Sequence, residues 1–252
     1  MGLHEAAERY RQRIFQEYQS SIARELTLTS PADPVAAFGP IYRAHFLPHI
    51  PASKDACILD VGCGTGSLLA WLQQEGYRHV QGVDRSPQMV RLARERQVQV
   101  EQADALEYLR AHPASFDVLL CMDVLEHFFK DEAVEFLDAC HAALKPGGVF
   151  VAHTLNADGI AGGRLRHIDF THENAFTRYS LAQILTVTGF EDFIFRPAGP
   201  VAQDFRSWVR CQLWRVFRLG ACLYYHAETG SGILHNDHIV TGTLVVKAVK
   251  KK

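Results

Sequence analysis

Short apolar runs alternate with helical patterns along the middle of the chain. Residues 58–61, 116–122 and 149–153 are mainly apolar, and 79–84 and 98–103, which also carry polar residues, have the same length as these strands. Residues 67–74 follow the first run with helical spacing. Strands that alternate with helices are typical of βαβ units, so the pattern predicts an α/β domain with a parallel sheet.

Three further segments surround this core. A sixth strand is expected at 192–196 and a last strand at 239–249. Near the start of the chain, helical spacing over 5–24 is followed by a Ser/Pro/Asp break at 29–34 and a short helix at 36–47. We therefore expect an N-terminal helical cap at 1–50 and an α/β domain at 51–252. Within that domain, 199–238 forms an insertion.

The first strand ends in a glycine turn. Residues 58–66 read Ile-Leu-Asp-Val-Gly-Cys-Gly-Thr-Gly, and such a turn lets the backbone approach a ligand and points a helix N-terminus at it. Gly62, Gly64 and Gly66 have the spacing G-x-G-x-G, whereas the dinucleotide fingerprint is G-x-G-x-x-G. With Asp60 ahead of the glycines, the segment resembles the first motif of class I S-adenosyl-L-methionine (SAM) dependent methyltransferases.

The later strands carry acids in the same order as this family. Asp84 ends the second strand, and an acid about 20 residues past the glycines binds ribose hydroxyls in doubly wound folds. Asp104 follows the third strand, and 123–127 and 144–148 follow the fourth strand and precede the fifth. The resemblance implies a Rossmann-like seven-stranded sheet in the order 3-2-1-4-5-7-6, with the last strand antiparallel.

The resemblance also implies SAM as the cofactor, with S-adenosyl-L-homocysteine as the product. It assigns Asp84 to the ribose, Asp104 to the adenine, and Met122 with Asp123 to the floor near the sulfonium. The full expected cofactor set is Asp60, Gly62, Cys63, Gly64, Gly66, Asp84, Arg85, Met89, Asp104, Ala105 and Met122.

Methyl transfer is an in-line displacement that depends mainly on holding the acceptor atom in place. A hydroxyl acceptor must also lose its proton, which a histidine or carboxylate in reach can accept. We expect His172, His127 and Asp123 to be the catalytic residues, with a structural capping role as the alternative for the pair Glu126 and His127. His153 and His167 are further candidate bases.

No metal is expected. His167, Asp169 and His172 have a spacing that could hold a transition ion. Two histidines, however, are a poor ligand set for magnesium, which prefers oxygen.

Residues 169–190 contain Asp-Phe-Thr-His, then Phe-Thr, Ser-Leu and Gly-Phe, and this pattern resembles methyltransferases of polysaccharide and natural-product pathways. It implies O-methylation of a sugar or glycan hydroxyl. O- or N-methylation of a phenolic or acid metabolite, and a non-catalytic SAM-binding protein, are the alternatives. Nucleic acid is not expected as a partner, because Asp-Val-Leu-Glu stands where DNA amino-methyltransferases carry N-P-P-Y.

Composition and cysteine spacing indicate the cellular compartment that we expect. The 252 residues carry a net charge of −2 and six cysteines without a C-x-x-C pair, and the charged N-terminus has no secretory stretch. We expect a cytoplasmic protein with reduced thiols.

Residues 205–226 form an amphipathic pattern with four arginines and no acid. Such a helix packs on the sheet, pairs in a homodimer, or lies on the inner surface of a membrane. Its arginines argue against a membrane span.

Overall fold

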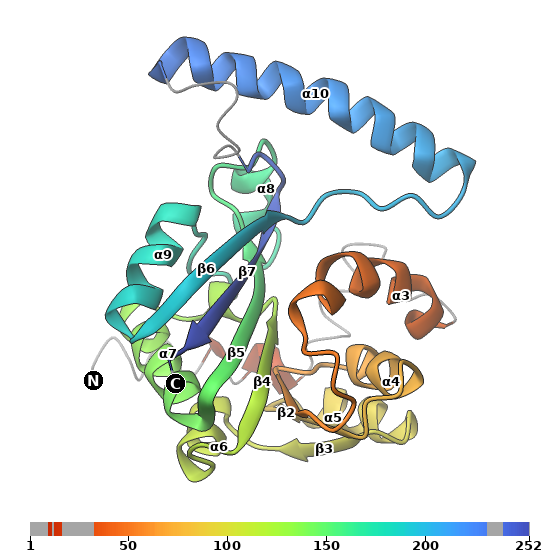
Figure 1. The fold of residues 1–252 in the computed structure, drawn as a ribbon, viewed down its shortest axis with the longest axis vertical. Helices are drawn as coiled ribbons and strands as arrows, with labels where there is room; N and C mark the ends of the chain where they lie inside the picture. Colours follow the sequence, from red (N-terminus) through yellow and green to blue (C-terminus); the bar gives the residue numbers. More distant parts are fainter. Residues whose placement is uncertain (1–9, 12, 17–32, 231–238, 252) are drawn as a thin grey trace.

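The computed structural model describes residues 10–11, 13–16, 33–230 and 239–251. Its centre is a seven-stranded sheet in the order β3-β2-β1-β4-β5-β7-β6 (Figure 1). β7 runs antiparallel to β5 and β6, and the other neighbours are parallel. The predicted fold class and strand order are confirmed. The strands are β1 Cys57–Val61, β2 His79–Asp84, β3 Gln99–Gln102, β4 Phe116–Met122, β5 Leu144–Leu155, β6 Phe190–Pro197 and β7 Thr243–Lys250.

Strand bounds differ most where antiparallel pairing extends a strand. β5 continues to Leu155, beyond the predicted 149–153, because its register with β7 runs from Val149 to Leu155. β7 begins at Thr243 rather than at 239. Ile239 and Val240 are buried but lie outside the strand, so their apolar character reflects burial in irregular chain.

Helices cover both faces of the sheet. One face carries α3 Pro34–His45, α4 Ser67–Gln74 and α5 Pro87–Glu95, and the other carries α6 Ala105–Ala111, α7 Lys130–Ala143 and α9 Arg178–Val187. The short helices are η1 Leu47–His49, η2 Leu125–His127 and α8 Gly162–Arg166. The helix predicted at 36–47 corresponds to α3. Of the helix predicted at 5–24, residues 10–11 and 13–16 are helical and the rest lies outside the described residues.

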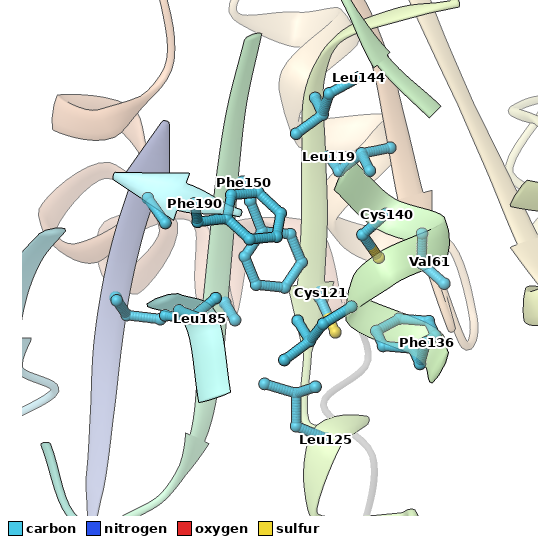
Figure 2. Close-up of a cluster of buried hydrophobic side chains, with 14 of the residues drawn as sticks. Val61, Leu119, Cys121, Leu125, Phe136, Cys140, Leu144, Phe150, Leu185 and Phe190 are labelled. Carbon is cyan, nitrogen blue, oxygen red and sulfur yellow. The ribbon is translucent and has the colours of Figure 1, made fainter. Parts of the chain in front are cut away.

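Two apolar clusters fill the space between the sheet and its helices. Figure 2 shows the cluster under α7 and α9, where Phe150 and Phe190 lie together near Leu185, and Phe136 lies on the other side near Cys140. The cluster on the opposite face includes Trp71 of α4, packed with α3. This double burial fixes the carboxyl ends of β1, β2 and β4 relative to one another.

The insertion before β7 contains one long helix, α10 Phe205–Thr229, which matches the helix predicted over 205–226. Figure 1 shows α10 held apart from the sheet and its flanking helices. The structure describes the whole helix, and none of its side chains is buried. Packing of its apolar face on the sheet is therefore the one alternative that the structure contradicts. Among the described residues, no helix has both the length and the apolarity needed to cross a membrane.

Candidate active site

A cavity of about 790 Å³ lies at the carboxyl ends of β1, β2 and β4. In this sheet the chain order reverses between β1 and β4, and open α/β sheets bind ligands at such a switch point. Loops after the three strands form its floor, and α3 forms part of its wall. The aromatic and aliphatic lining side chains are Phe15, Phe38, Ile41, Tyr42, Phe46, Met89, Leu106, Met122, Val124 and Phe128.

The glycine turn is shaped for close approach. Gly62 has φ +69°, and a Cβ there would lie 2.4 Å from Cγ2 of Val124. Gly64 has φ +51°, and a Cβ there would meet no atom within 4 Å, so its open side faces space that a ligand can fill. Gly62, Cys63 and Gly64 line the cavity, whereas Gly66 precedes α4 as its N-cap.

Asp84 ties this turn to β2. Its Oδ2 accepts a hydrogen bond from the Gly64 N–H at 2.9 Å, and its Oδ1 accepts one from the Ser86 N–H at 2.8 Å. Burial raises the pKa of Asp84, while these two backbone donors oppose the rise. The carboxylate lines the cavity, where it is available to ligand hydroxyls.

Asp60 lies beneath the turn and is 1% exposed. Within the described part of the chain, neither of its carboxylate oxygens has a hydrogen-bond partner. Burial, with a smaller contribution from Asp84, raises its pKa to about 8. A buried carboxyl without a partner is costly, and a cationic ligand next to it would relieve that cost.

The remaining expected cofactor residues also lie around the cavity. Arg85, Met89, Asp104, Ala105 and Met122 all line it. Asp104 is in addition the N-cap of α6, where its Oδ1 accepts from the backbone N–H of Leu106 at 2.9 Å. Every member of the expected cofactor set except Asp60 and Gly66 therefore contributes to the cavity wall.

An Asp–His pair occupies the floor. Asp123, at φ +55°, places Oδ1 2.6 Å from Nδ1 of His153. Burial would lower the pKa of His153, but the adjacent Asp123 carboxylate outweighs it and raises that pKa above the ordinary value. Burial conversely favours a higher pKa for Asp123, and His153 reverses this. The pair is thus stabilised in its charged form.

His127 sits nearby in a different electrostatic state. Its Nδ1 lies 2.8 Å from Oγ1 of Thr171, which donates its hydroxyl hydrogen to Oδ1 of Asp169 at 2.7 Å. Because that hydroxyl has one hydrogen, Nδ1–H of His127 must be the donor, and Nε2 carries the lone pair. Burial, with His172 adding to it, lowers the pKa of His127 to about 4. His127 is therefore a neutral imidazole at the cavity wall.

His172 lies behind His127, outside the set of described residues that line the cavity. The two ring centroids are 4.9 Å apart, and Nδ1–H of His172 donates to the Leu165 carbonyl oxygen at 2.9 Å. The expectation that His172 is the base remains a prediction, and of the two histidines His127 is the one that reaches the cavity.

Glu126 supports the same region from below. It is 1% exposed, and Oε2 accepts from the Thr154 hydroxyl at 2.9 Å. Its backbone carbonyl accepts from the N–H groups of Glu173 and Asn174 at 2.7 and 3.0 Å. Burial, then the Asp123 charge, raise the pKa of Glu126 to about 8. These contacts hold η2 against β5 and residues 173–174, and the capping role expected for the pair Glu126 and His127 stays a prediction.

The N-terminal segment contributes two lining residues that sequence reasoning missed. Arg11 and Phe15 both line the cavity, and Arg11 donates to the His127 carbonyl oxygen at 2.9 Å and to Glu132. Tyr10 of the same segment does not line the cavity and donates to Glu173. The helical spacing at 5–24 could not show which side faces the cavity, because the residues that Arg11 contacts, His127 and Glu132, are more than 100 positions away in the sequence.

His167, Asp169 and His172 have a spacing that could hold a transition ion. Across the ranges that the structure describes, no three His, Cys, Asp or Glu side chains are grouped to hold a metal ion. His167 is exposed, and Asp169 is engaged by Thr171.

Comparisons with known proteins agree with this geometry. Residues 58–148 match the family model described as "Methyltransferase domain". A ubiquinone biosynthesis O-methyltransferase of Xylella fastidiosa is 38% identical over 132 residues, which cover 50% of this chain and 52% of that protein. The chain thus spans about half the length of this curated relative.

Solved structures share the fold. A SAM-dependent methyltransferase from Archaeoglobus fulgidus superposes with a TM-score of 0.65 at 20% identity, covering 86% of this chain and 94% of that one. Phosphoethanolamine N-methyltransferase 2 of Haemonchus contortus, solved with SAM, gives a TM-score of 0.61 at 19% identity, over 94% of this chain and 60% of that one. Residues 58–148 therefore resemble a methyltransferase domain in sequence, and the chain shares the fold of these solved SAM-dependent methyltransferases.

Proposed function

We propose that this chain is a SAM-dependent O-methyltransferase whose acceptor is a hydroxyl on a small, largely apolar molecule of the phenolic type. The observation that carries the proposal is the neutral His127 imidazole, with its Nε2 lone pair, on the wall of an aromatic-lined cavity above the glycine turn. The match of 58–148 to a methyltransferase domain supports the transfer chemistry.

The residues present fit SAM. Asp84 and Asp104 line the cavity, and the buried Asp60 beneath the glycine turn has no partner among the described residues, so that its ionised form would favour a positively charged ligand. Asp84 would hold ribose hydroxyls, Asp104 the adenine, and the open face of Gly64 leaves room for the ligand backbone. When bound, SAM supplies an electrophilic methyl group on a sulfonium.

The protein's own part in the reaction is positioning and proton removal. Aromatic side chains exclude water from the cavity and orient a flat acceptor. Nε2 of His127 accepts the hydroxyl proton, while Thr171 and Asp169 hold the ring in the tautomer that makes this possible. The positive charge that develops on His127 is then stabilised by the nearby Asp169 and Asp123 carboxylates.

The lining favours a phenol over a glycan. Sugars need many hydrogen-bond partners, whereas much of the cavity wall away from the glycine turn is apolar, formed by Phe15, Phe38, Ile41, Phe46 and Phe128. The glycan acceptor that the pattern at 169–190 suggested finds no support in the relatives, whereas the curated relative of Xylella is itself named for O-methylation.

The test is methyl transfer from labelled SAM to a panel of catechols, simple phenols, nucleotide sugars, aliphatic acids and amines, with S-adenosyl-L-homocysteine release as a common readout. Label in phenolic hydroxyls is expected. Label confined to sugars or amines would overturn the proposed acceptor. Tight SAM binding by calorimetry without turnover on any acceptor class would favour a non-catalytic SAM-binding protein.

A further inference from the structure

The apolar face of α10 is exposed along its whole length. Phe205, Val216, Leu219 and Leu223 recur at helical spacing and are 76%, 68%, 56% and 48% exposed. A continuous exposed apolar face of this kind marks an interaction surface rather than ordinary surface chain.

The opposite side of α10 is the one that faces the protein. Cys211 Sγ donates to the Pro200 carbonyl oxygen at 3.3 Å, and Tyr225 Oη donates to the Asp158 carbonyl oxygen at 3.0 Å. Trp214 lines a second cavity of about 450 Å³ between the helix and the body. The helix is thus held by its inner side, and its apolar face points outward.

The charge of α10 indicates which kind of surface it binds. Residues 205–226 contain Arg206, Arg210, Arg215 and Arg218 and no acid, in a chain whose net charge is −2. At 100° per residue, Arg206 and Arg210 flank one edge of the apolar face and Arg215 flanks the other. A helix with an apolar face bordered by arginines and aromatic rings matches a surface of hydrocarbon bordered by anionic groups.

A second copy of the chain fits less well. Pairing two α10 helices through their apolar faces would bring eight arginines together, four from each helix by the count above, with Glu228 of each as the acid within the helix. Like charges placed opposite one another are unfavourable. An anionic surface removes this repulsion.

We propose that α10 is an interfacial helix that lies flat on a membrane containing anionic lipid, with Phe205, Val216, Leu219 and Leu223 in the acyl boundary and the flanking arginines among the head groups. At 1.5 Å per residue its 25 residues span about 37 Å, enough to rest on several lipids at once. Trp208, half exposed and stacked on Phe205, and Tyr224 lie at the level where aromatic side chains favour the interface.

In this orientation α10 lies between the lipid surface and the second cavity. The second cavity, whose wall includes Trp208 and Cys211 of α10, shares His45 and Gly199 with the main cavity. Through these two shared residues the second cavity adjoins the main cavity.

The experiment is co-sedimentation of the full chain with vesicles of equal parts phosphatidylglycerol and phosphatidylcholine, compared with phosphatidylcholine alone. Binding is expected to the anionic vesicles and to weaken with added salt. Val216→Glu should reduce the partition coefficient by more than about tenfold, since it removes apolar burial and adds a repelled charge.

Val187→Glu is the matched control. Val187 is 70% exposed, close to the 68% of Val216, but it belongs to α9. The same substitution there should leave partitioning within about twofold of the parent. The double variant Arg206→Gln, Arg210→Gln should lower the partition coefficient onto anionic vesicles about 30-fold, because each arginine near an anionic surface contributes roughly 1 kcal/mol.

Circular dichroism and thermal melts establish that each variant is folded. Equal sedimentation with neutral and anionic vesicles would overturn the proposal. An equal loss of vesicle binding in Val187→Glu and Val216→Glu would overturn it as well. A concentration-dependent dimer without lipid that Val216→Glu abolishes, with no vesicle binding by the parent, would overturn it in favour of a second copy.

Discussion

His127 shows how local hydrogen bonds set a chemical role. Because its pKa is lowered to about 4 by burial, it is neutral above that pH and able to accept a proton. We predict that His127→Gln lowers kcat about 10²- to 10⁴-fold with SAM affinity nearly unchanged. The parent rate should show an acidic limb near pH 4 rather than near the ordinary histidine pKa of about 6.5. Stopped-flow or steady-state kinetics across pH 4–9 measures both, and an unchanged kcat would remove His127 from the reaction.

Thr171 offers a finer test of the same residue. Thr171→Val keeps the shape of the side chain but removes the hydroxyl that accepts from His127 Nδ1–H. We expect kcat to fall about tenfold or more while KM stays within about threefold, whereas Thr171→Ser should retain most of the activity. Equal losses in the Val and Ser variants would show that the residue acts through packing alone.

The raised pKa of Asp60 makes the stability of the free protein depend on pH. In the free protein its pKa of about 8 lies far above the value of about 4 in an unfolded chain. The folded state therefore holds a proton that the unfolded state has released between about pH 4 and 8, and stability falls as pH rises through that window. Asp60→Asn should flatten this fall and raise Tm at pH 8 while weakening SAM binding. Calorimetric unfolding at several pH values checks the slope, and a steeper slope in the variant would contradict the assignment.

Some residue roles were within reach of the sequence and others were not. Asp84, Asp104 and Met122 line the cavity as expected, because each directly follows or ends a parallel strand whose carboxyl end lies at the same sheet edge. The link from His127 through Thr171 to Asp169 joins residues 44 positions apart. No local pattern encodes that contact, so it required the folded structure.

At the scale of elements, the glycine turn between β1 and α4 is the most constrained segment of the site. We predict that Gly62→Ala destabilises the protein by about 1–3 kcal/mol, from the left-handed φ of +69° and the clash with Val124. Adding Val124→Ala should recover the stability that the clash costs, whereas the loss caused by the left-handed φ should remain. Urea denaturation of the single and double variants separates the two contributions. Full recovery in the double variant would mean that φ costs nothing here.

The bounds of strands were easier to predict than the way in which helices pack. The predicted bounds of β2 and β4 match the observed ones, since each segment is short and has an acidic residue at its end or directly after it. α10 was expected as an amphipathic helix, but periodicity could not say whether its apolar face would pack on the sheet. That outcome depends on how the loops on both sides hold the helix, through contacts such as Tyr225 to Asp158.

At the scale of the whole molecule, SAM binding should stabilise the fold. A ligand at 100 times its Kd adds about 2.7 kcal/mol, which corresponds to a rise in Tm of about 5–10 °C for a protein of this size. Asp84→Ala should abolish this rise, because it removes both the ribose contact and the bond that holds Gly64. Glu95→Ala, at an exposed acid on α5, is the control and should keep it. Differential scanning fluorimetry measures the shift, and an equal shift in the Asp84 variant would refute the proposed cofactor contacts.

The position of β7 between β5 and β6 has a consequence for synthesis of the protein. When a ribosome has made the chain as far as α10, the edge of β5 that β7 later covers is still without its partner, and β6 has no strand to join. An open strand edge of this kind invites pairing with other chains. The nascent chain therefore displays this edge until Thr243–Lys250 emerges. During that interval it is a natural client for chaperones.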